Sequence, residues 1–422
     1  MAFKNEVLAW QADIVATTQR LIQFNTVETE ALPNAPFGRG NRDALDYVLN
    51  LGSTWGFTVK DLDGYAGYLE FGDGEEVVAV IPHLDVVPEG GDWEYPPFGG
   101  ELHDGRIYGR GASDNKGPAV AALYAFKLVH DSGLPLKKRV RLVFGCDEES
   151  GFECIKHYSK VEGLPTCGFT PDGSFPVVNA EKGIISGTFA STLPEGIQTL
   201  RFKGGTARNV VPQYAKAVVE GKTYEATGIA AHASTPEKGE NAIVKLAGEL
   251  QAVLTHPVLD FLQIASNRES LDIALEDELS GPLTYNLGLI DVDEKNAKIT
   301  INIRYPVTGD AGKIIEKLKK AGEPYRFSFE DYTNSSPHCV PEDSVLVKTL
   351  LQAYTGVTGL TGKPLSMGGG TYARILGNFV AFGARFPEGT STAHQKNEWI
   401  AVDALLKATE IYANAIYQLA KE

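Results

Sequence analysis

The sequence of 422 residues has no long apolar run and no excess of basic side chains. No apolar run reaches the roughly 18 residues that a membrane-spanning helix needs. Residues 1–11 lack the basic and apolar blocks of a signal peptide, so none is expected. The 39 basic against 54 acidic residues give a net charge of -15, which argues against nucleic acid or an anionic membrane as a partner. We therefore expect a cytoplasmic protein.

Cysteine is also scarce in the sequence. The four thiols are too few and too irregularly spaced for a disulfide framework or for a zinc site built from paired cysteines. They are Cys146, Cys154, Cys167 and Cys339. Because no export signal is expected, we predict that all four are reduced.

The length of the chain predicts two domains, because a single core stops growing at roughly 250–300 residues. Apolar runs typical of buried strands lie at 77–81 and 140–144, with a predicted helix at 117–129 between them. This order indicates an α/β domain with a mixed sheet flanked by helices. Strand and helix signals between 217 and 320 instead favour an α+β domain with antiparallel pairing.

The simplest arrangement is a discontinuous main domain, residues 1–185 and 335–422, interrupted by an inserted domain at 186–334. We expect a ferredoxin-like α+β fold for the inserted domain. Further helices are predicted at 4–23, 241–254, 311–320 and 402–420, and further strands at 217–220, 222–230 and 298–304.

Residues able to bind metal follow the predicted strands. His83 and Asp85 come directly after the run at 77–81, at the carboxyl edge of a sheet where open α/β folds build their sites. Side chains two residues apart on an extended chain point the same way, so Asp85 can hold the ring of His83. By itself, a histidine in this place is more often an ordinary surface residue.

Three successive carboxylates, Asp147 to Glu149, follow the second run at 140–144. Neighbouring carboxylates repel one another unless a cation or solvent relieves them. One of two adjacent glutamates can then bind metal while the other acts as a base. A solvated acidic turn is the simpler interpretation of this motif on its own.

A further acidic residue, Asp114, is at the centre of the glycine-rich loop 109–117. The spacing of this loop fits neither a P-loop nor a dinucleotide fingerprint, and an aspartate would repel phosphate. A cation suits the loop better. With Asp172 and His394 added, the set combines two histidines with several carboxylates, which are donors that zinc, manganese or cobalt accept.

The order of these motifs resembles that of the dinuclear zinc exopeptidases, the family of carboxypeptidase G, aminoacylase and carnosinase. The resemblance is carried by HLD at 83–85, DGRIYGRG at 104–111, DNKG at 114–117 and DEESG at 147–151. Further segments are most similar to the PepV-type bacterial dipeptidases, namely NAEKG at 179–183, AHASTPEKGENA at 231–242, NIRYP at 302–306 and GGGTY at 368–372. The resemblance implies a dipeptidase that hydrolyses dipeptides or short peptides with free termini.

The resemblance also implies two divalent metal ions, zinc in the first place, with manganese or cobalt as alternatives. Asp114 would bridge both ions, and the peptide bond after it would be cis. His83 and Asp172 would complete one metal site. Glu149 and His394 would complete the other.

Catalytic roles are implied for three further residues. Glu148 would be the general base that activates a hydroxide held between the two ions. Asp85 would orient His83. The inserted domain would act as a lid, from which His232 stabilises the oxyanion that forms on the scissile carbonyl.

For substrate binding, the resemblance implies Arg304, Asn209, Gly370 and Thr371. Arg304 would pair in bidentate fashion with the free carboxylate of a dipeptide. A monomer is expected, because the inserted domain is long enough to supply its own histidine. A homodimer through the inserted domain is the alternative.

Two other functions stay open at this point. An N-acyl-amino-acid amidohydrolase would use the same metals and base and would differ only in its pocket. A binding protein that keeps the fold without catalysis is the interpretation from another class. The complete set of ligands, base and lid histidine argues against the binding protein.

The other histidines are interpreted as structural or surface residues. His338 lies in a turn bracketed by prolines. We expect solvent exposure for the remaining four, which lie beside turn or helix-surface signals: His103, His130, His157 and His256.

Overall fold

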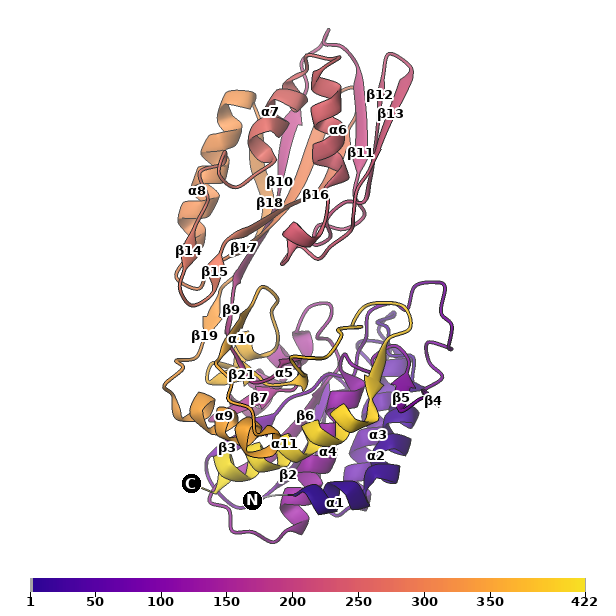
Figure 1. Cartoon of the computed structure of the whole chain (residues 1–422), viewed down its shortest axis with the longest axis vertical. Coiled ribbons are helices and arrows are strands. Elements are labelled where there is room, and N and C mark those ends of the chain that lie inside the picture. Colours follow the sequence, from indigo (N-terminus) through magenta and orange to yellow (C-terminus); the bar gives the residue numbers. More distant parts are fainter. Residues whose placement is uncertain (1–2, 422) are drawn as a thin grey trace. The chain divides into compact units, whose positions relative to one another are not determined.

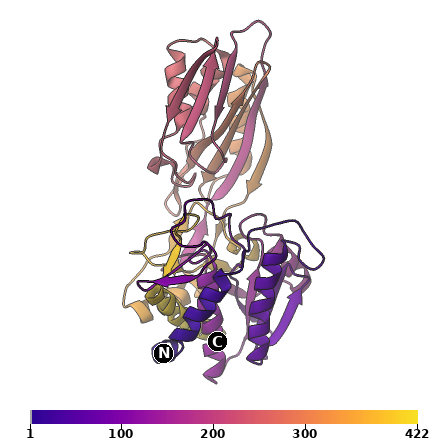
Figure 2. The ribbon, with the colours of Figure 1, turned by 90° about the vertical axis from the view of Figure 1, so that its right-hand side faces the viewer.

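A computed structural model of the chain describes residues 3–421. The chain divides into two compact units, and each is described by itself. The first unit comprises residues 1–179, 340–365 and 371–422, and the second comprises 180–339 and 366–370. Figure 1 and Figure 2 show each unit as a sheet with its own helices.

The first unit contains most of a nine-stranded mixed sheet, whose order is β1-β2-β6-β3-β7-β21-β9-β19 with β20 paired to β9; β19 and the last two residues of β9 and of β20 belong to the second unit. The strands of this sheet are β1 (Thr58–Leu62), β2 (Ala66–Phe71), β3 (Val77–Val80), β6 (Arg139–Gly145), β7 (Cys167–Thr170), β9 (Val178–Glu181), β19 (His338–Cys339), β20 (Leu365–Met367) and β21 (Phe379–Ala381). β3 is the central strand, because it pairs in parallel with both β6 and β7. All four residues of β3 are buried, which explains its unbroken run of apolar residues.

Helices pack around this sheet and complete the core of the first unit. They are α1 (Lys4–Ala9), α2 (Gln11–Ile22), α3 (Arg39–Thr54), α4 (Lys116–Asp131), α5 (Glu153–Glu162), α9 (Val345–Thr358), α10 (Ala373–Leu376) and α11 (Val402–Ala420). α4 and α11 pack against each other and both contact β6. α4 is apolar on nearly every side because it is buried almost throughout its length. Short strands form two small sheets in the same unit: β4 (Glu101–His103), β5 (Arg106–Tyr108), β8 (Gly173–Ser174), β22 (Ala384–Arg385) and β23 (Trp399–Ala401).

The second unit is an antiparallel sheet of seven strands in the order β13-β12-β11-β16-β17-β10-β18. The strands are β10 (Gly183–Thr192), β11 (Leu200–Gly204), β12 (Tyr214–Val219), β13 (Lys222–Thr227), β16 (Thr284–Val292), β17 (Asn296–Tyr305) and β18 (Ser328–Ser335). Three helices lie on one face of this sheet: α6 (Ala242–Gln251), α7 (Pro257–Ala265) and α8 (Ala311–Gly322) (Figures 1 and 2). A two-stranded sheet, β14 (Glu276–Asp277) and β15 (Gly281–Pro282), joins them. The apolar side chains between helices and sheet form a separate core.

The prediction of an α/β fold with a mixed sheet flanked by helices is confirmed for the first unit. The single helix predicted at 4–23 is wrong in one respect, because two helices meet at Trp10. The backbone of Trp10 leaves helical geometry (φ -97°, ψ 8°), and its ring packs edge-on against Tyr124 of α4. The apolar spacing continues across this break, so the sequence pattern could not locate it.

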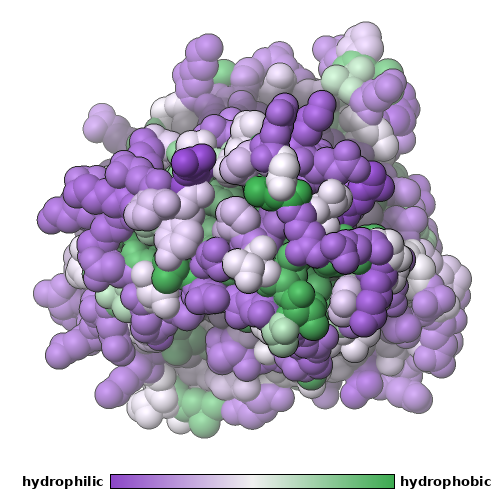
Figure 3. All heavy atoms as spheres, turned by 90° about the horizontal axis from the view of Figure 1, so that it is seen from above, coloured by the Kyte–Doolittle hydropathy of each residue, from purple (hydrophilic) through white to green (hydrophobic). Residues whose placement is uncertain are grey.

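Hydrophilic side chains predominate on the face drawn in Figure 3, where hydrophobic ones form small separate groups. Apolar side chains gather instead in the two cores. Among residues 3–421, no helix combines the length and the apolar character that crossing a membrane requires. All four cysteines are free thiols, and only Cys339 is exposed.

Candidate metal centre

Three parallel strands deliver candidate ligands to one edge of the sheet in the first unit. His83 follows β3, and a parallel bridge to Gly145 at the end of β6 fixes its place. Glu148 and Glu149 follow β6, and Asp172 follows β7. Because β3 pairs with both neighbours in parallel, the carboxyl ends of the three strands meet.

Asp114 lies between the two predicted histidine ligands. Its Oδ1 is 3.0 Å from Nε2 of His83, and its Oδ2 is 3.2 Å from Nε2 of His394. The same nitrogen of His394 is 2.9 Å from Oε1 of Glu149. One carboxylate that faces two histidines with different oxygens has the arrangement expected of a bridging ligand. The peptide bond between Asp114 and Asn115 is cis, as the resemblance implied.

These contacts shift the pKa values of the groups involved. Burial opposes charge on His83, but hydrogen bonds with Asp114 and Asp85 outweigh it and raise the pKa of His83 well above its usual value. Burial likewise opposes charge on His394, and hydrogen bonds with Asp114 and Glu149 raise its pKa to about 11. For Asp114, the hydrogen bonds with both histidines overcome burial and hold its pKa well below the ordinary range.

The remaining carboxylates crowd the same place. Ligand atoms of His83, Glu148 and Asp172 lie within 4.8 Å of one another, and so do those of His83, Asp114 and Glu149. Burial, followed by the charge of Asp172, raises the pKa of Glu148 well above its usual value. Burial and the charge of Asp114 raise the pKa of Glu149. Such crowding of acidic groups costs free energy unless a cation relieves it.

Asp85 supports the site in two ways. Nδ1 of His83 donates to the backbone carbonyl of Asp85 at 3.0 Å, and the Asp85 carboxylate lies 3.4 Å from the same nitrogen. Its other oxygen accepts hydrogen bonds from the backbone N–H groups of Glu148 and Glu149, at 2.8 and 3.0 Å. The predicted contact with His83 is therefore present, and the carboxylate also fixes the turn that carries both glutamates.

The donor set fits a pair of divalent cations. It offers imidazole nitrogens and carboxylate oxygens. Two groups of three side chains, which share His83, each provide the three protein donors that are usual where a metal also binds water or substrate. Nδ1 of His83 is already engaged by Asp85, which leaves Nε2 directed at the cluster. Oxygen and nitrogen donors of this kind suit zinc, manganese and cobalt alike.

The other predicted residues belong mostly to the second unit. His232 is exposed, and its Nδ1 lies 2.7 Å from the hydroxyl of Ser234. The backbone N–H of Ala233, next to His232, donates to the carbonyl of Asn209 at 2.9 Å. The Ala233 carbonyl accepts from the hydroxyl of Thr284 at 3.3 Å.

Thr284 pairs with Arg304 between β16 and β17, so these contacts bring Arg304, Asn209 and His232 to one end of the second unit. Arg304 is buried, and its Nε donates to Asn302 at 2.8 Å. Its Nη1 donates to the carbonyl of Gly368 at 3.0 Å.

Gly370 and Thr371 lie where the chain passes from one unit to the other. Gly370 belongs to the second unit together with Gly368, the partner of Arg304. Thr371 is buried in the first unit, and its hydroxyl accepts from the N–H of Ala373 at the start of α10.

Glu398 is a buried carboxylate to which the sequence pattern assigned no role. It lies four residues after His394 and contacts the loop that carries Asp114. An acidic residue four positions after a candidate histidine ligand is the only signal for Glu398 in the sequence. That signal has no specificity without the fold.

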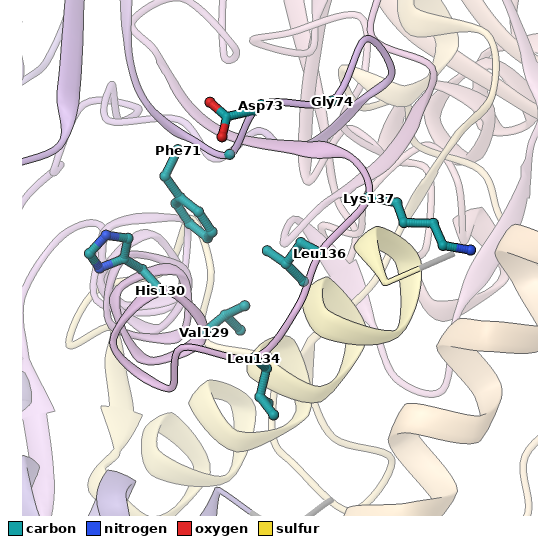
Figure 4. Close-up of a pocket in the computed structure, with 9 residues that line it drawn as sticks. Phe71, Asp73, Gly74, Val129, His130, Leu134, Leu136 and Lys137 are labelled. Atoms are coloured by element: carbon teal, nitrogen blue, oxygen red, sulfur yellow. The ribbon is translucent and has the colours of Figure 1, made fainter.

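A hollow of about 440 Å³ elsewhere in the first unit has a different character. Figure 4 shows the rings of Phe71 and His130 side by side, and they pack edge to face with centroids 5.2 Å apart. The aliphatic side chains of Val129, Leu134 and Leu136 also line the hollow. Its lining provides fewer than three metal-binding side chains. The candidate metal centre therefore remains the edge of the sheet beyond β3, β6 and β7.

The chain is similar to known proteins over its whole length. Residues 79–418 match the family model described as peptidase family M20/M25/M40. The protein named "Putative dipeptidase YtjP" from Bacillus subtilis (strain 168) is 41% identical over 467 aligned positions, and the match covers 100% of both chains. The aligned length exceeds the 422 residues of this chain, so YtjP carries insertions relative to it.

Solved structures share the fold at low sequence identity. Human carnosine dipeptidase 1 has a TM-score of 0.64 at 14% identity, with 100% of both chains covered. The dipeptidase Dug1p from Saccharomyces cerevisiae has a TM-score of 0.64 at 13% identity, with 99% of this chain and 98% of that chain covered. The family model spans most of the sequence, and its matched range contains every residue of the candidate metal centre. The chain belongs to peptidase family M20/M25/M40.

Proposed function

We propose that the protein is a metal-dependent dipeptidase that hydrolyses dipeptides or short peptides with free termini. The observation that carries the proposal is Asp114, which faces His83 with one carboxylate oxygen and His394 with the other. The chain is 41% identical over its full length to YtjP, which is named as a putative dipeptidase, and this identity supports the choice of substrate class.

The first unit would hold two divalent ions, zinc in the first place, with manganese or cobalt as alternatives. His83 and Asp172 would bind one ion, Glu149 and His394 the other, and Asp114 both. When bound, such ions acidify water and polarise a carbonyl group near neutral pH. Their positive charge would also relieve the repulsion among the neighbouring carboxylates.

Glu148 would move the proton in the reaction. It lies beside His83 and Asp172, and the Asp85 carboxylate holds its backbone N–H. A carboxylate fixed in this way can accept a proton from the attacking water and return it to the leaving amine. Asp85 would thus position both the base and a ligand.

The second unit would supply contacts to the substrate and act as a lid. His232 is exposed and can donate a hydrogen bond to a developing oxyanion. The guanidinium of Arg304 is suited to bind the terminal carboxylate of a substrate, and Asn209 lies at the same end of the unit. Gly370 and Thr371 would line the substrate path, and the chain would work as a monomer in the cytoplasm.

A substrate panel tests the proposed function. Purified protein loaded with zinc would be assayed on dipeptides, on the same dipeptides with acetylated N-termini or amidated C-termini, and on N-acyl amino acids. Free dipeptides should be hydrolysed with the highest kcat/KM. Faster hydrolysis of N-acyl amino acids would instead identify an N-acyl-amino-acid amidohydrolase and overturn the substrate class.

A further inference from the structure

We propose that Glu398 and Arg110 form a buried positioning pair that holds two candidate metal ligands, Asp114 and His394, in place. The inference rests on the proposed function, because it concerns the same metal centre. It adds two residues that touch neither the ligand atoms nor the substrate.

Glu398 is completely buried, and its carboxylate collects five hydrogen bonds. Oε1 accepts from the backbone N–H groups of Ser113 and Asp114, at 2.8 and 3.0 Å, and from the Ser113 hydroxyl at 3.0 Å. Oε2 accepts from Nη1 of Arg110 at 2.7 Å and from the N–H of Gly111 at 3.0 Å. One carboxylate thus accepts hydrogen bonds from three backbone N–H groups of the loop 109–117, those of Gly111, Ser113 and Asp114.

Arg110 extends the network to the segment that carries His394. Only 2% of its surface is exposed. Besides Glu398, its Nη1 donates to the carbonyl of Gln395, the residue after His394, at 3.2 Å. Its Nη2 donates to the carbonyls of Pro88 and Glu89, both at 3.3 Å. The ion pair therefore makes hydrogen bonds to three segments that are distant in the sequence, at 88–89, 111–114 and 395.

The chemistry explains why a charge is needed here. A backbone loop that turns several N–H groups inward must satisfy them, and a carboxylate accepts from several donors at once. Hydrogen bonds to a charged acceptor are about twice as strong as neutral ones. Arg110 pairs with the buried carboxylate at 2.7 Å and offsets part of the cost of burying a negative charge next to Asp114. Removing one member of such a pair leaves the other charge buried and unpaired.

The test compares Glu398→Gln with a matched control, Glu70→Gln. Glu70 of β2 also pairs with a buried arginine, Arg141 of the neighbouring strand β6. The Nε of Arg141 donates to the carboxylate of Glu70 at 2.7 Å. Strands β2 and β6 pair so that Ala66 lies opposite Gly145, at the end of the sheet near His83. Glu70 lies four residues farther along β2, away from that end. The control removes an equivalent charge away from the metal centre.

Metal-free protein would be titrated with Co²⁺ and followed by visible absorption, with folding checked by circular dichroism. Glu398→Gln should lower Co²⁺ affinity by about 10- to 100-fold, the usual loss when a residue that orients ligands is removed. Its kcat should fall while KM changes little. Glu70→Gln should keep the affinity and spectrum of the unaltered protein, although its unfolding temperature falls.

Folded Glu398→Gln that binds Co²⁺ within about threefold of the unaltered protein would overturn the proposal, since it predicts a loss of at least about tenfold. If Glu398→Gln fails to fold, Glu398→Asp replaces it, because the shorter carboxylate keeps the charge but cannot reach both Arg110 and Asp114. Weaker Co²⁺ binding by folded Glu398→Asp supports the proposal, and unchanged binding overturns it. Failure of the proposed function would be seen separately, as unaltered protein that neither binds Co²⁺ nor cleaves dipeptides.

Discussion

Glu148 and Glu149 are neighbours in the sequence, but their contacts differ. Glu149 meets Nε2 of His394 at 2.9 Å, whereas Glu148 lies beside Asp172 and His83. The backbone N–H groups of both are held by Asp85, so the turn cannot exchange their places without breaking these bonds. Adjacent glutamates can therefore take different roles, one as ligand and the other as base.

The substitution Glu148→Gln should separate these roles. Kcat should fall by about 100- to 10,000-fold, because the amide cannot accept the proton. Metal content should stay equal to that of the unaltered protein, as measured by elemental analysis. A loss of one ion per chain would show that Glu148 is a ligand and would remove it from the role of base.

At Arg304, the buried guanidinium predicts a selective effect on binding. Arg304→Ala should raise KM for dipeptides with a free carboxylate by about 10- to 100-fold, corresponding to the loss of a charged hydrogen bond of roughly 1.5–3 kcal/mol. The KM for the amidated dipeptides should change far less. Steady-state kinetics on matched pairs of substrates checks this, and equal effects on both would contradict the proposed role.

Sequence patterns could predict the candidate ligands but not the residues that support them. His83, Asp114 and Glu149 stand out because each lies in a motif with several unusual neighbours. Glu398 lacks such neighbours, and its importance comes from donors that the fold brings from about 285 residues away in the sequence. Contacts made only after folding leave no local periodicity or spacing to recognise.

His256 shows the same limit for a secondary-structure element. We expected it to be exposed, and this was wrong, because only 1% of its surface is accessible. It begins α7, where its Nδ1 accepts a hydrogen bond from the N–H of Val258 at 3.2 Å. Histidine is an uncommon residue in this capping position, so the usual signals for the start of a helix gave no warning.

Capping by His256 should make the second unit sensitive to acid. Burial lowers the pKa of His256 in the folded state, and Asp260 only partly opposes this. Between the unfolded pKa of about 6.5 and the lower folded value, the unfolded state binds more protons. The free energy of unfolding should therefore decrease as the pH falls below about 6.5, because the protonated Nδ1 cannot accept the capping bond.

The comparison is between the unaltered protein and His256→Asn, which keeps a capping oxygen but does not titrate. Urea unfolding at pH 7.5 and pH 5.5 should show a smaller loss of stability for the variant. The control is His103→Asn, at a surface histidine of the first unit. Equal pH dependence of His256→Asn and the unaltered protein would contradict this account of the cap.

Helices and strands with clear periodicity were predicted well, but not all of their ends were. The predicted helix at 402–420 matches α11, and the predicted strand at 298–304 lies within β17. The strand predicted at 222–230 ends at Thr227. Its pairing with β12 stops there, and the chain then turns toward α6, a tertiary event that apolar spacing does not encode.

At the scale of the whole molecule, the two units have separate hydrophobic cores. All five proposed ligands belong to the first unit. A metal ion whose free concentration is 100 times its Kd stabilises the folded state that binds it by about 2.7 kcal/mol. Zinc should therefore slow amide hydrogen exchange in β3 and β6 and leave exchange in β16 and β17 nearly unchanged. Equal slowing in all four strands would contradict a metal centre confined to the first unit.

The length of the chain and the change of pattern near residue 185 predict two domains with limits at 185 and 335. The second unit of the structure also includes residues 366–370, which join it through contacts such as Lys182 to Met367. A segment of five residues that returns to the other unit carries no compositional signal. Its place is fixed by hydrogen bonds formed in the folded chain.

The decisive experiment on the proposed function is the dependence of dipeptide hydrolysis on the metal. Purified protein would be assayed on a dipeptide before chelation, after complete metal removal verified by elemental analysis, and after zinc is added back. The account predicts that activity disappears with the metal and returns when about two ions per chain are restored, the content of a two-metal site. Full activity in protein shown to be free of metal would contradict it.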